Sequence, residues 1–402
     1  MTRSVALTFV VRASRIGLGL LASIISARAL GPSGRGDYYF AVTFAGAVVQ
    51  FGQLGLASSN TYLVARDHAL LPRLAVNSIW VSIVLGLGAG VVTALAAFAA
   101  DAFPTVSGGL IWYGVVLAPP TLFYLLGVNL LVGVGRIRAF NGVELGANAL
   151  ALVLTAGAAL VGAGVAGFLG ATIAAWTASA IVLALLVLRG ARPAAAFDRA
   201  VFAGGWRYAA KAYVITLIGF LVLRSNVFLL QAFSGPQQLG YYSIAAQIGD
   251  VLAILPASVA LVLFPGLVKD APTRWPVMVR TAGVVAALVV LASAVTAVVA
   301  APVIALLFGQ AFAPAVAVLL YMLPGVVFLG VATIVAQYLG AIGLPRALIG
   351  VWVVVLACVV GLSLALTPTF GAAGSAAALS ASYLVLLLLV AALALRHRAA
   401  TR

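Results

Sequence analysis

The chain has 402 residues, of which 65% are hydrophobic and only 7% are charged, with a formal net charge of +15. A water-soluble surface needs far more charged side chains than this sequence supplies. The composition therefore excludes a water-soluble domain and indicates a membrane protein.

Apolar runs of about 20 residues recur along the chain, and they predict twelve membrane-spanning helices. In chain order the runs cover residues 9–30, 38–59, 74–98, 110–132, 141–163, 168–188, 209–232, 239–266, 277–300, 314–338, 347–367 and 373–395. The runs are too long and too evenly apolar for barrel strands, so we predict an all-α membrane protein. Because no gap exceeds roughly twenty residues, we expect the mechanism to lie within the helices.

All Lys and Arg residues except Arg28, Arg35 and Arg224 fall on one side of this arrangement. The positive-inside rule makes that side cytoplasmic, so we predict that both termini are cytoplasmic. Positive charge at the membrane edge also argues against a nucleic-acid partner. The single cysteine, Cys358, lies within a predicted span, and the two histidines stand far apart. The sequence therefore predicts no disulfide, no metal site and no cofactor.

The two halves of the chain repeat each other. A shift of 204 residues places Gly31, Pro32 and Tyr38 on Gly235, Pro236 and Tyr242. Six spans in each repeat put both repeats the same way up in the membrane, as parallel repeats. We predict an N-terminal six-helix lobe over 1–190, a cytoplasmic linker over 191–208 and a C-terminal six-helix lobe over 209–402. Two such lobes favour a transporter with alternating access, although duplication also simply builds a stable bundle.

Charged side chains at membrane depth are costly and mark candidate functional residues. Arg224 and Asp250 lie about 18 and about 21 Å from the turn near Pro236, at ~1.5 Å rise per residue, so we expect them to pair. Their pairing has two interpretations, a binding site or an ion pair that locks the hairpin. Asn226, two residues after Arg224, points elsewhere. Glu144 is interpreted as an interfacial partner of Arg136 or Arg138.

Polar side chains also form matching stripes in the two halves. Gln247 and Asp250 share one helix face with Ser243, and Thr43, Gln50 and Gln53 form the corresponding stripe. Amides on such faces often join helices by hydrogen bonds, but the repetition favours a polar lumen. No catalytic residue is predicted. The candidate lumen residues are Arg28, Arg35, Gln50, Gln53, Arg224, Gln247 and Asp250.

The segment ARALGPSGRGDY (27–38) resembles the ARxLGPxGxG opening of polysaccharide flippases. These transporters belong to the multidrug, oligosaccharidyl-lipid and polysaccharide exporter (MOP) superfamily. The segments LFP (263–265), IALLFGQAF (304–312) and FGAAGSA (370–376) resemble later motifs of the same family, so the resemblance covers essentially the whole chain. The chain departs from the family pattern at Asn226, where the family usually has Asp.

The resemblance implies a V-shaped bundle of twelve helices in the bacterial inner (cytoplasmic) membrane. It implies that the protein flips a polyprenyl-diphosphate-linked oligosaccharide from the cytoplasmic to the outer leaflet for surface polysaccharide, including lipopolysaccharide. Other polysaccharide-assembly membrane proteins are expected partners. Lumen arginines suit the diphosphate, and glutamines suit sugar hydroxyls.

Three alternatives remain open at this point. A MOP-type drug exporter needs acidic lumen groups, whereas these lumen residues are net positive. A membrane glycosyltransferase or polymerase needs catalytic groups in a sizeable outer loop, and no predicted loop is large enough. A scaffold in an envelope complex needs neither feature.

Overall fold

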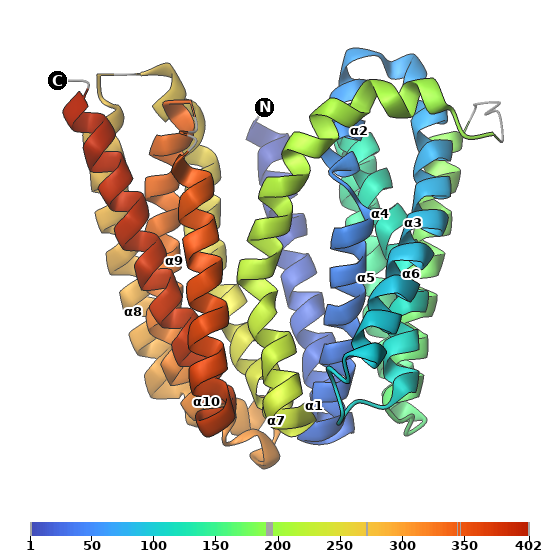
Figure 1. The fold of residues 1–402 in the computed structure, drawn as a ribbon, viewed down its shortest axis with the longest axis vertical. Helices are drawn as coiled ribbons and strands as arrows, with labels where there is room; N and C mark the ends of the chain where they lie inside the picture. The colour runs from blue at the N-terminus through green and yellow to red at the C-terminus, as the bar shows by residue number, and fades with distance from the viewer. Residues whose placement is uncertain (1, 190–195, 271, 344, 346, 401–402) are drawn as a thin grey trace. The chain divides into compact units, whose positions relative to one another are not determined.

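The computed structural model describes residues 2–189, 196–270, 272–343, 345 and 347–400. Every regular element in these ranges is a helix (Figure 1). The α-helices are α1 (Thr2–Gly52), α2 (Leu56–Arg66), α3 (Leu71–Ala99), α4 (Gly108–Gly133), α5 (Ile137–Leu160), α6 (Val165–Leu188), α7 (Arg199–Lys269), α8 (Arg274–Phe308), α9 (Ala315–Ala341) and α10 (Ala347–Ala400). Two short 3-10 helices, η1 (His68–Leu70) and η2 (Gln310–Phe312), complete the set.

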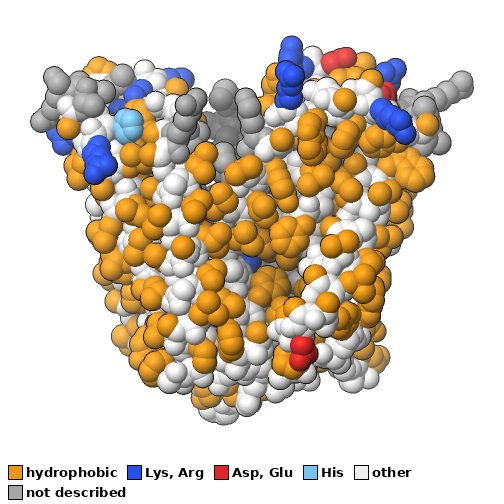
Figure 2. Space-filling view, in the orientation of Figure 1, with side chains coloured by type: hydrophobic (Ala, Val, Ile, Leu, Met, Phe, Trp, Pro, Cys, Tyr) orange, Lys and Arg blue, Asp and Glu red, His pale blue; other side chains and the backbone are white. Residues whose placement is uncertain are grey.

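Nine helices among the described residues are long and apolar enough to cross a membrane. Hydrophobic side chains dominate the flank of each unit in the space-filling view, and most of the charged ones gather at its ends (Figure 2). The predicted class, an all-α membrane protein, is confirmed. The twelve-helix count and the cytoplasmic location of the termini stay predictions.

Three of the long helices are interrupted by a glycine with positive φ, at Gly31 (65°), Gly235 (74°) and Gly371 (57°). Each interrupted helix folds back on itself (Figure 1). In α7, Asn226 Nδ2 donates a hydrogen bond to the Tyr242 hydroxyl oxygen over 2.6 Å, although the two residues are 16 positions apart. A straight helix would separate them by about 24 Å. Glycine is required at such turns because L side chains disfavour this backbone region.

The second predicted span, 38–59, does not continue as one helix. α1 ends at Gly52, and Leu54 and Gly55 adopt positive φ values of 46° and 77° before α2 begins at Leu56. A Cβ at Gly55 would lie 2.0 Å from the carbonyl oxygen of Ala209. The bend therefore lets the backbone of α7 approach very closely, and hydropathy carries no signal for that contact.

The chain divides into two compact units, Met1–Phe220 and Leu221–Arg402. In the first unit, α4 packs against α1, α2, α3 and α6, and Leu122, Leu126 and Leu130 are fully buried. In the second unit, α9 packs between α8 and α10, with Leu319, Ile334 and Leu339 fully buried.

The beginning of α7 is anchored to the first unit. Asn77 Nδ2 donates to the carbonyl oxygen of Asp198 over 2.9 Å, and Asp198 N–H donates to Asn77 Oδ1 over 2.8 Å. Arg73 also lies 3.5 Å from the Asp198 carboxylate. The predicted linker covered 191–208, of which residues 191–195 lie outside the described residues. The part from Asp198 onward packs on α2 and α3 as an N-capped helix.

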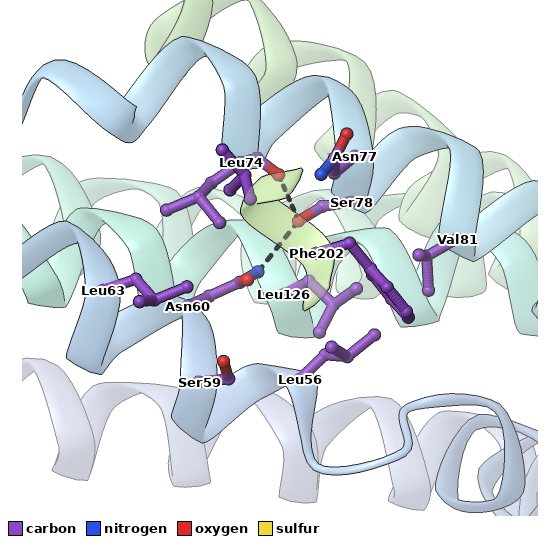
Figure 3. A pocket seen from close by; sticks show the side chains of 11 residues that line it. Leu56, Ser59, Asn60, Leu63, Leu74, Asn77, Ser78, Val81, Leu126 and Phe202 are labelled. Atoms are coloured by element: carbon purple, nitrogen blue, oxygen red, sulfur yellow. Dashed lines mark hydrogen bonds between the residues drawn. The ribbon is translucent and has the colours of Figure 1, made fainter. Parts of the chain in front are cut away.

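Figure 3 shows the pocket beside this anchor, where Phe202 of α7 faces residues of α2, α3 and α4. Asn60 donates to the Ser78 hydroxyl oxygen over 2.8 Å, and that hydroxyl donates to the Leu74 carbonyl over 2.7 Å. The cavity volume is about 10 Å³, which holds one water molecule at most. We therefore place no substrate there.

Candidate functional site

The second unit contains a cavity of about 100 Å³ between α7, α9 and α10. Most of its wall is apolar, and a small group of polar side chains interrupts it. Its lining residues are Leu223, Arg224, Tyr242, Ala246, Gly249, Asp250, Ala253, Met322, Gly325, Val326, Leu329, Leu379, Ser380 and Tyr383.

Arg224 and Asp250 both line this cavity, although 26 positions separate them in the chain. The reversal of α7 at Gly235 brings them to the same depth, as their distances from the turn predicted. Arg224 is half-buried, Asp250 is exposed, and the two charges attract each other. Tyr383 of α10 is 6% exposed and lies within electrostatic reach of both. The wall of the cavity is therefore largely apolar, but it contains a cation (Arg224), an anion (Asp250) and a phenol (Tyr383).

A buried polar cluster supports one wall of the cavity. Asn226 is fully buried and donates from Nδ2 to the Tyr242 hydroxyl over 2.6 Å and to the Ser375 hydroxyl over 3.3 Å. Tyr242 lines the cavity, whereas Asn226 does not. The prediction that Asn226 points away from Arg224 agrees with this placement. Its role here is to fix Tyr242 in position.

Ser380 of α10 joins the wall of the cavity to α9 beside Pro324. The Ser380 hydroxyl accepts from Gly325 N–H over 3.1 Å and donates to the Tyr321 carbonyl over 2.6 Å. In a regular helix, Gly325 N–H would itself bond the Tyr321 carbonyl. Pro324 lies at this turn of α9, and the serine hydroxyl bonds both the donor and the acceptor. No pattern in the sequence pointed to Ser380.

The two arginines of the first predicted turn occupy different environments. Arg35 is only 5% exposed, and its guanidinium donates to the hydroxyls of Ser26 (2.6 Å) and Ser23 (2.9 Å). It also lies over the ring of Tyr38, 5.5 Å from the centroid. Arg28, by contrast, is exposed. Arg35 therefore ties the two halves of α1 together inside the first unit, while Arg28 is accessible to a ligand.

The predicted glutamines are partly engaged with the protein. Gln53 Nε2 donates to Gln50 Oε1 over 2.7 Å, and the buried Gln50 Nε2 has no hydrogen-bond partner among the described residues. Gln247 is half-buried, and Ser243 on the same stripe is buried and bonded to the Gly240 carbonyl. Ser243 is therefore a helix-packing residue, while Gln50 has an unmet donor.

Glu144 pairs with a residue that the sequence did not suggest. Its carboxylate forms a salt bridge with Arg15 of α1 and accepts from the Tyr124 hydroxyl over 3.0 Å. The predicted partners, Arg136 and Arg138, are exposed and take no part. Their nearness in sequence was misleading because α1 packs directly against α5. Within the described residues, no group of three or more His, Cys, Asp or Glu side chains could hold a metal ion.

Several solved structures share this fold. One is "Lipid II flippase MurJ, inward closed conformation", with a TM-score of 0.78, 13% identity, and coverage of 96% of this chain and 86% of that one. Another is an inward-facing multidrug resistance MATE family transporter of the MOP superfamily, with a TM-score of 0.77, 16% identity and coverage of 96% and 95%. A MOP superfamily transporter from Pyrococcus furiosus gives a TM-score of 0.64, 15% identity and coverage of 98% and 94%.

The chain thus has the fold of these structures, and its nine long apolar helices among the described residues make it a multi-pass membrane protein. Residues 1–269 match the family described as "Polysaccharide biosynthesis protein". The chain belongs to this family, which confirms the resemblance carried by the motif at 27–38. No protein with a curated description matches the chain.

Proposed function

We propose that the protein flips a polyprenyl-diphosphate-linked oligosaccharide from the cytoplasmic to the outer leaflet of a bacterial cytoplasmic membrane, for surface polysaccharide assembly. The observation that carries the proposal is the placement of Arg224 in a cavity, on a helix segment long and apolar enough to cross a membrane. A charged side chain in such a segment is costly and marks a candidate functional site. Membership of the polysaccharide biosynthesis family supplies the class of substrate.

The guanidinium of Arg224 is suited to a diphosphate because it donates two parallel hydrogen bonds to phosphoryl oxygens. Asp250 neutralises this charge when the cavity holds no substrate, and the diphosphate displaces it by offering more negative charge. The cavity volume of about 100 Å³ is well below the roughly 300–1,000 Å³ of typical small-molecule sites. We therefore place only the diphosphate at Arg224, with the glycan extending beyond the cavity and the lipid tail in the bilayer.

The other residues that we propose for contact with polar ligand groups are Arg28, which is exposed, Gln247, which is half-buried, and Gln50, which has an unmet donor. Gln53 is buried and donates to Gln50, so we propose that it positions Gln50. We do not propose that Arg35 contacts the ligand, because its guanidinium already donates hydrogen bonds to Ser26 and Ser23 within α1. We propose no catalytic residue, and the expected protein partners in polysaccharide assembly stay a prediction.

The test follows radiolabelled sugar into the polyprenyl-diphosphate pool of a strain that lacks the protein. An external modifying enzyme then reports which leaflet holds the labelled lipid. Accumulation on the cytoplasmic leaflet, relieved by the wild type and not by Arg224→Ala, is the expected result. The exchange of charges, Arg224→Asp with Asp250→Arg, should keep the protein folded and abolish transport. Normal sidedness in the deletion strain, or full transport by the exchanged protein, would contradict the proposal.

The exposed carboxylate of Asp250 favours one second candidate, an exporter of cationic drugs. That function predicts drug hypersensitivity in the deletion strain, restored by the wild type and not by Asp250→Asn. Drug susceptibility and lipid sidedness measured in the same strains separate the two candidates.

A further inference from the structure

An apolar groove runs between the first half of α5 and the last half of α6, on the first unit. Its volume is about 420 Å³, which falls within the range of ligand sites. Gly142, Gly146 and Leu150 form its α5 wall, and Ser179, Val182 and Leu186 form its α6 wall. The Ser179 hydroxyl bonds the Ala175 carbonyl of its own helix, so the serine presents little polarity to the groove. The groove therefore suits a hydrocarbon chain.

Glycines make the groove deep. A Cβ added at Gly142 or Gly146 would meet no atom within 4 Å. Between Ala139 and Leu150 the groove follows α5 for about 17 Å, at ~1.5 Å per residue. Half of a bilayer hydrocarbon core is about 15 Å thick. The groove is thus about as long as the acyl region of one leaflet.

One end of the groove carries three arginines. Arg136 and Arg138 lie at the start of α5, and Arg189 follows the end of α6. The two helices form a hairpin, so these ends lie at the same side of the unit. All three side chains are exposed, and in the described part of the chain none of them forms a salt bridge. A cationic end beside an apolar groove complements a lipid with an anionic headgroup.

We propose that this groove binds an anionic phospholipid of the membrane, with its phosphate at Arg136, Arg138 and Arg189 and one acyl chain along Gly142 and Gly146. Basic pockets between membrane helices recognise anionic headgroups in this way. The lipid stabilises the α5–α6 hairpin and holds the three arginines at headgroup depth. This site is independent of the proposed transport substrate, which we place at Arg224.

The test compares phosphatidylglycerol with phosphatidylcholine on the delipidated full-length protein, by native mass spectrometry and by thermal unfolding. Wild-type protein should bind phosphatidylglycerol preferentially and unfold at a higher temperature with it. Gly146→Leu fills the groove and should abolish both effects. Gly157→Leu is the matched control, because Gly157 lies on α5 outside the groove and also meets nothing within 4 Å. It should behave as the wild type.

Replacing the three arginines with glutamine should weaken phosphatidylglycerol binding by about 100-fold, at ~1 kcal/mol for each cation, and leave phosphatidylcholine binding unchanged. Equal binding of the two lipids by the wild type would overturn the proposal, as would unchanged binding by Gly146→Leu. If undecaprenyl phosphate displaces phosphatidylglycerol from both the wild type and Gly157→Leu at a lower concentration than phosphatidylglycerol itself requires, the groove belongs to the isoprenyl lipid and the phospholipid proposal is wrong.

Discussion

Ser380 Oγ lies 3.1 Å from the backbone nitrogen of Gly325, so a side chain of α10 bonds the backbone of α9 beside Pro324. Both residues line the cavity that contains Arg224. One hydroxyl therefore joins α9 to α10 in the wall of the candidate site.

Removal of this hydroxyl should destabilise the second unit. In Ser380→Ala, Gly325 N–H and the Tyr321 carbonyl lose their hydrogen bonds to the Ser380 hydroxyl, at a cost of about 1–3 kcal/mol. Ser382→Ala is the control, because Ser382 is equally buried but bonds only the Ala378 carbonyl of its own helix. Unfolding in detergent monitored by circular dichroism measures both changes. Equal stability of the two variants would contradict the bridging role.

Substitutions of Arg35 and Arg28 should affect stability and transport in opposite order. Arg35→Ala leaves two buried serine hydroxyls without their donor, so we expect the free energy of unfolding to fall by about 1–3 kcal/mol. Arg28→Ala should change it by less than about 0.5 kcal/mol, because the side chain is exposed. The flipping assay should show the opposite ranking once expression levels are matched. Strong destabilisation by Arg28→Ala would be inconsistent with its position.

Gly55→Ala should be poorly tolerated for two reasons. The residue has a φ of 77°, and the added Cβ would lie 2.0 Å from the Ala209 carbonyl oxygen. We expect a loss of about 1–3 kcal/mol, measured by thermal unfolding of the purified protein. Gly170→Ala in α6 should be neutral or slightly stabilising, because its Cβ meets nothing within 4 Å and alanine favours helix.

The anchor at Asp198 predicts a local change in hydrogen exchange. Asn77→Ala removes both hydrogen bonds between the Asn77 amide and the Asp198 backbone, so amides at the start of α7 should exchange faster. Asn148→Ala is the control, because Asn148 bonds only the Glu144 carbonyl of its own helix. Exchange that is unchanged in Asn77→Ala would show that Phe202 and the salt bridge of Arg73 hold this segment by themselves.

Features set by local patterns were predicted well. Apolar runs predicted an all-α membrane protein, and Gly31, Gly235 and Gly371 lie in predicted gaps. Matching distances from one turn placed Arg224 and Asp250 at one cavity. Contacts between distant segments were not predicted, as with Glu144 and Arg15, which are 129 positions apart. Hydropathy measures the depth of a residue in the membrane but not which helix faces it, so it also gave no signal for the hydrogen bonds of Arg35 to Ser23 and Ser26.

The hairpins at Gly31, Gly235 and Gly371 reverse the chain within a single non-helical residue each. Almost no polypeptide protrudes there for an antibody, a protease or an inserted tag to reach. Mapping of membrane topology therefore depends on the longer connections, such as residues 100–107 and 161–164. If a probe fails to label the three hairpins in an accessibility experiment, the result would reflect how tight the turns are and not the side of the membrane on which they lie.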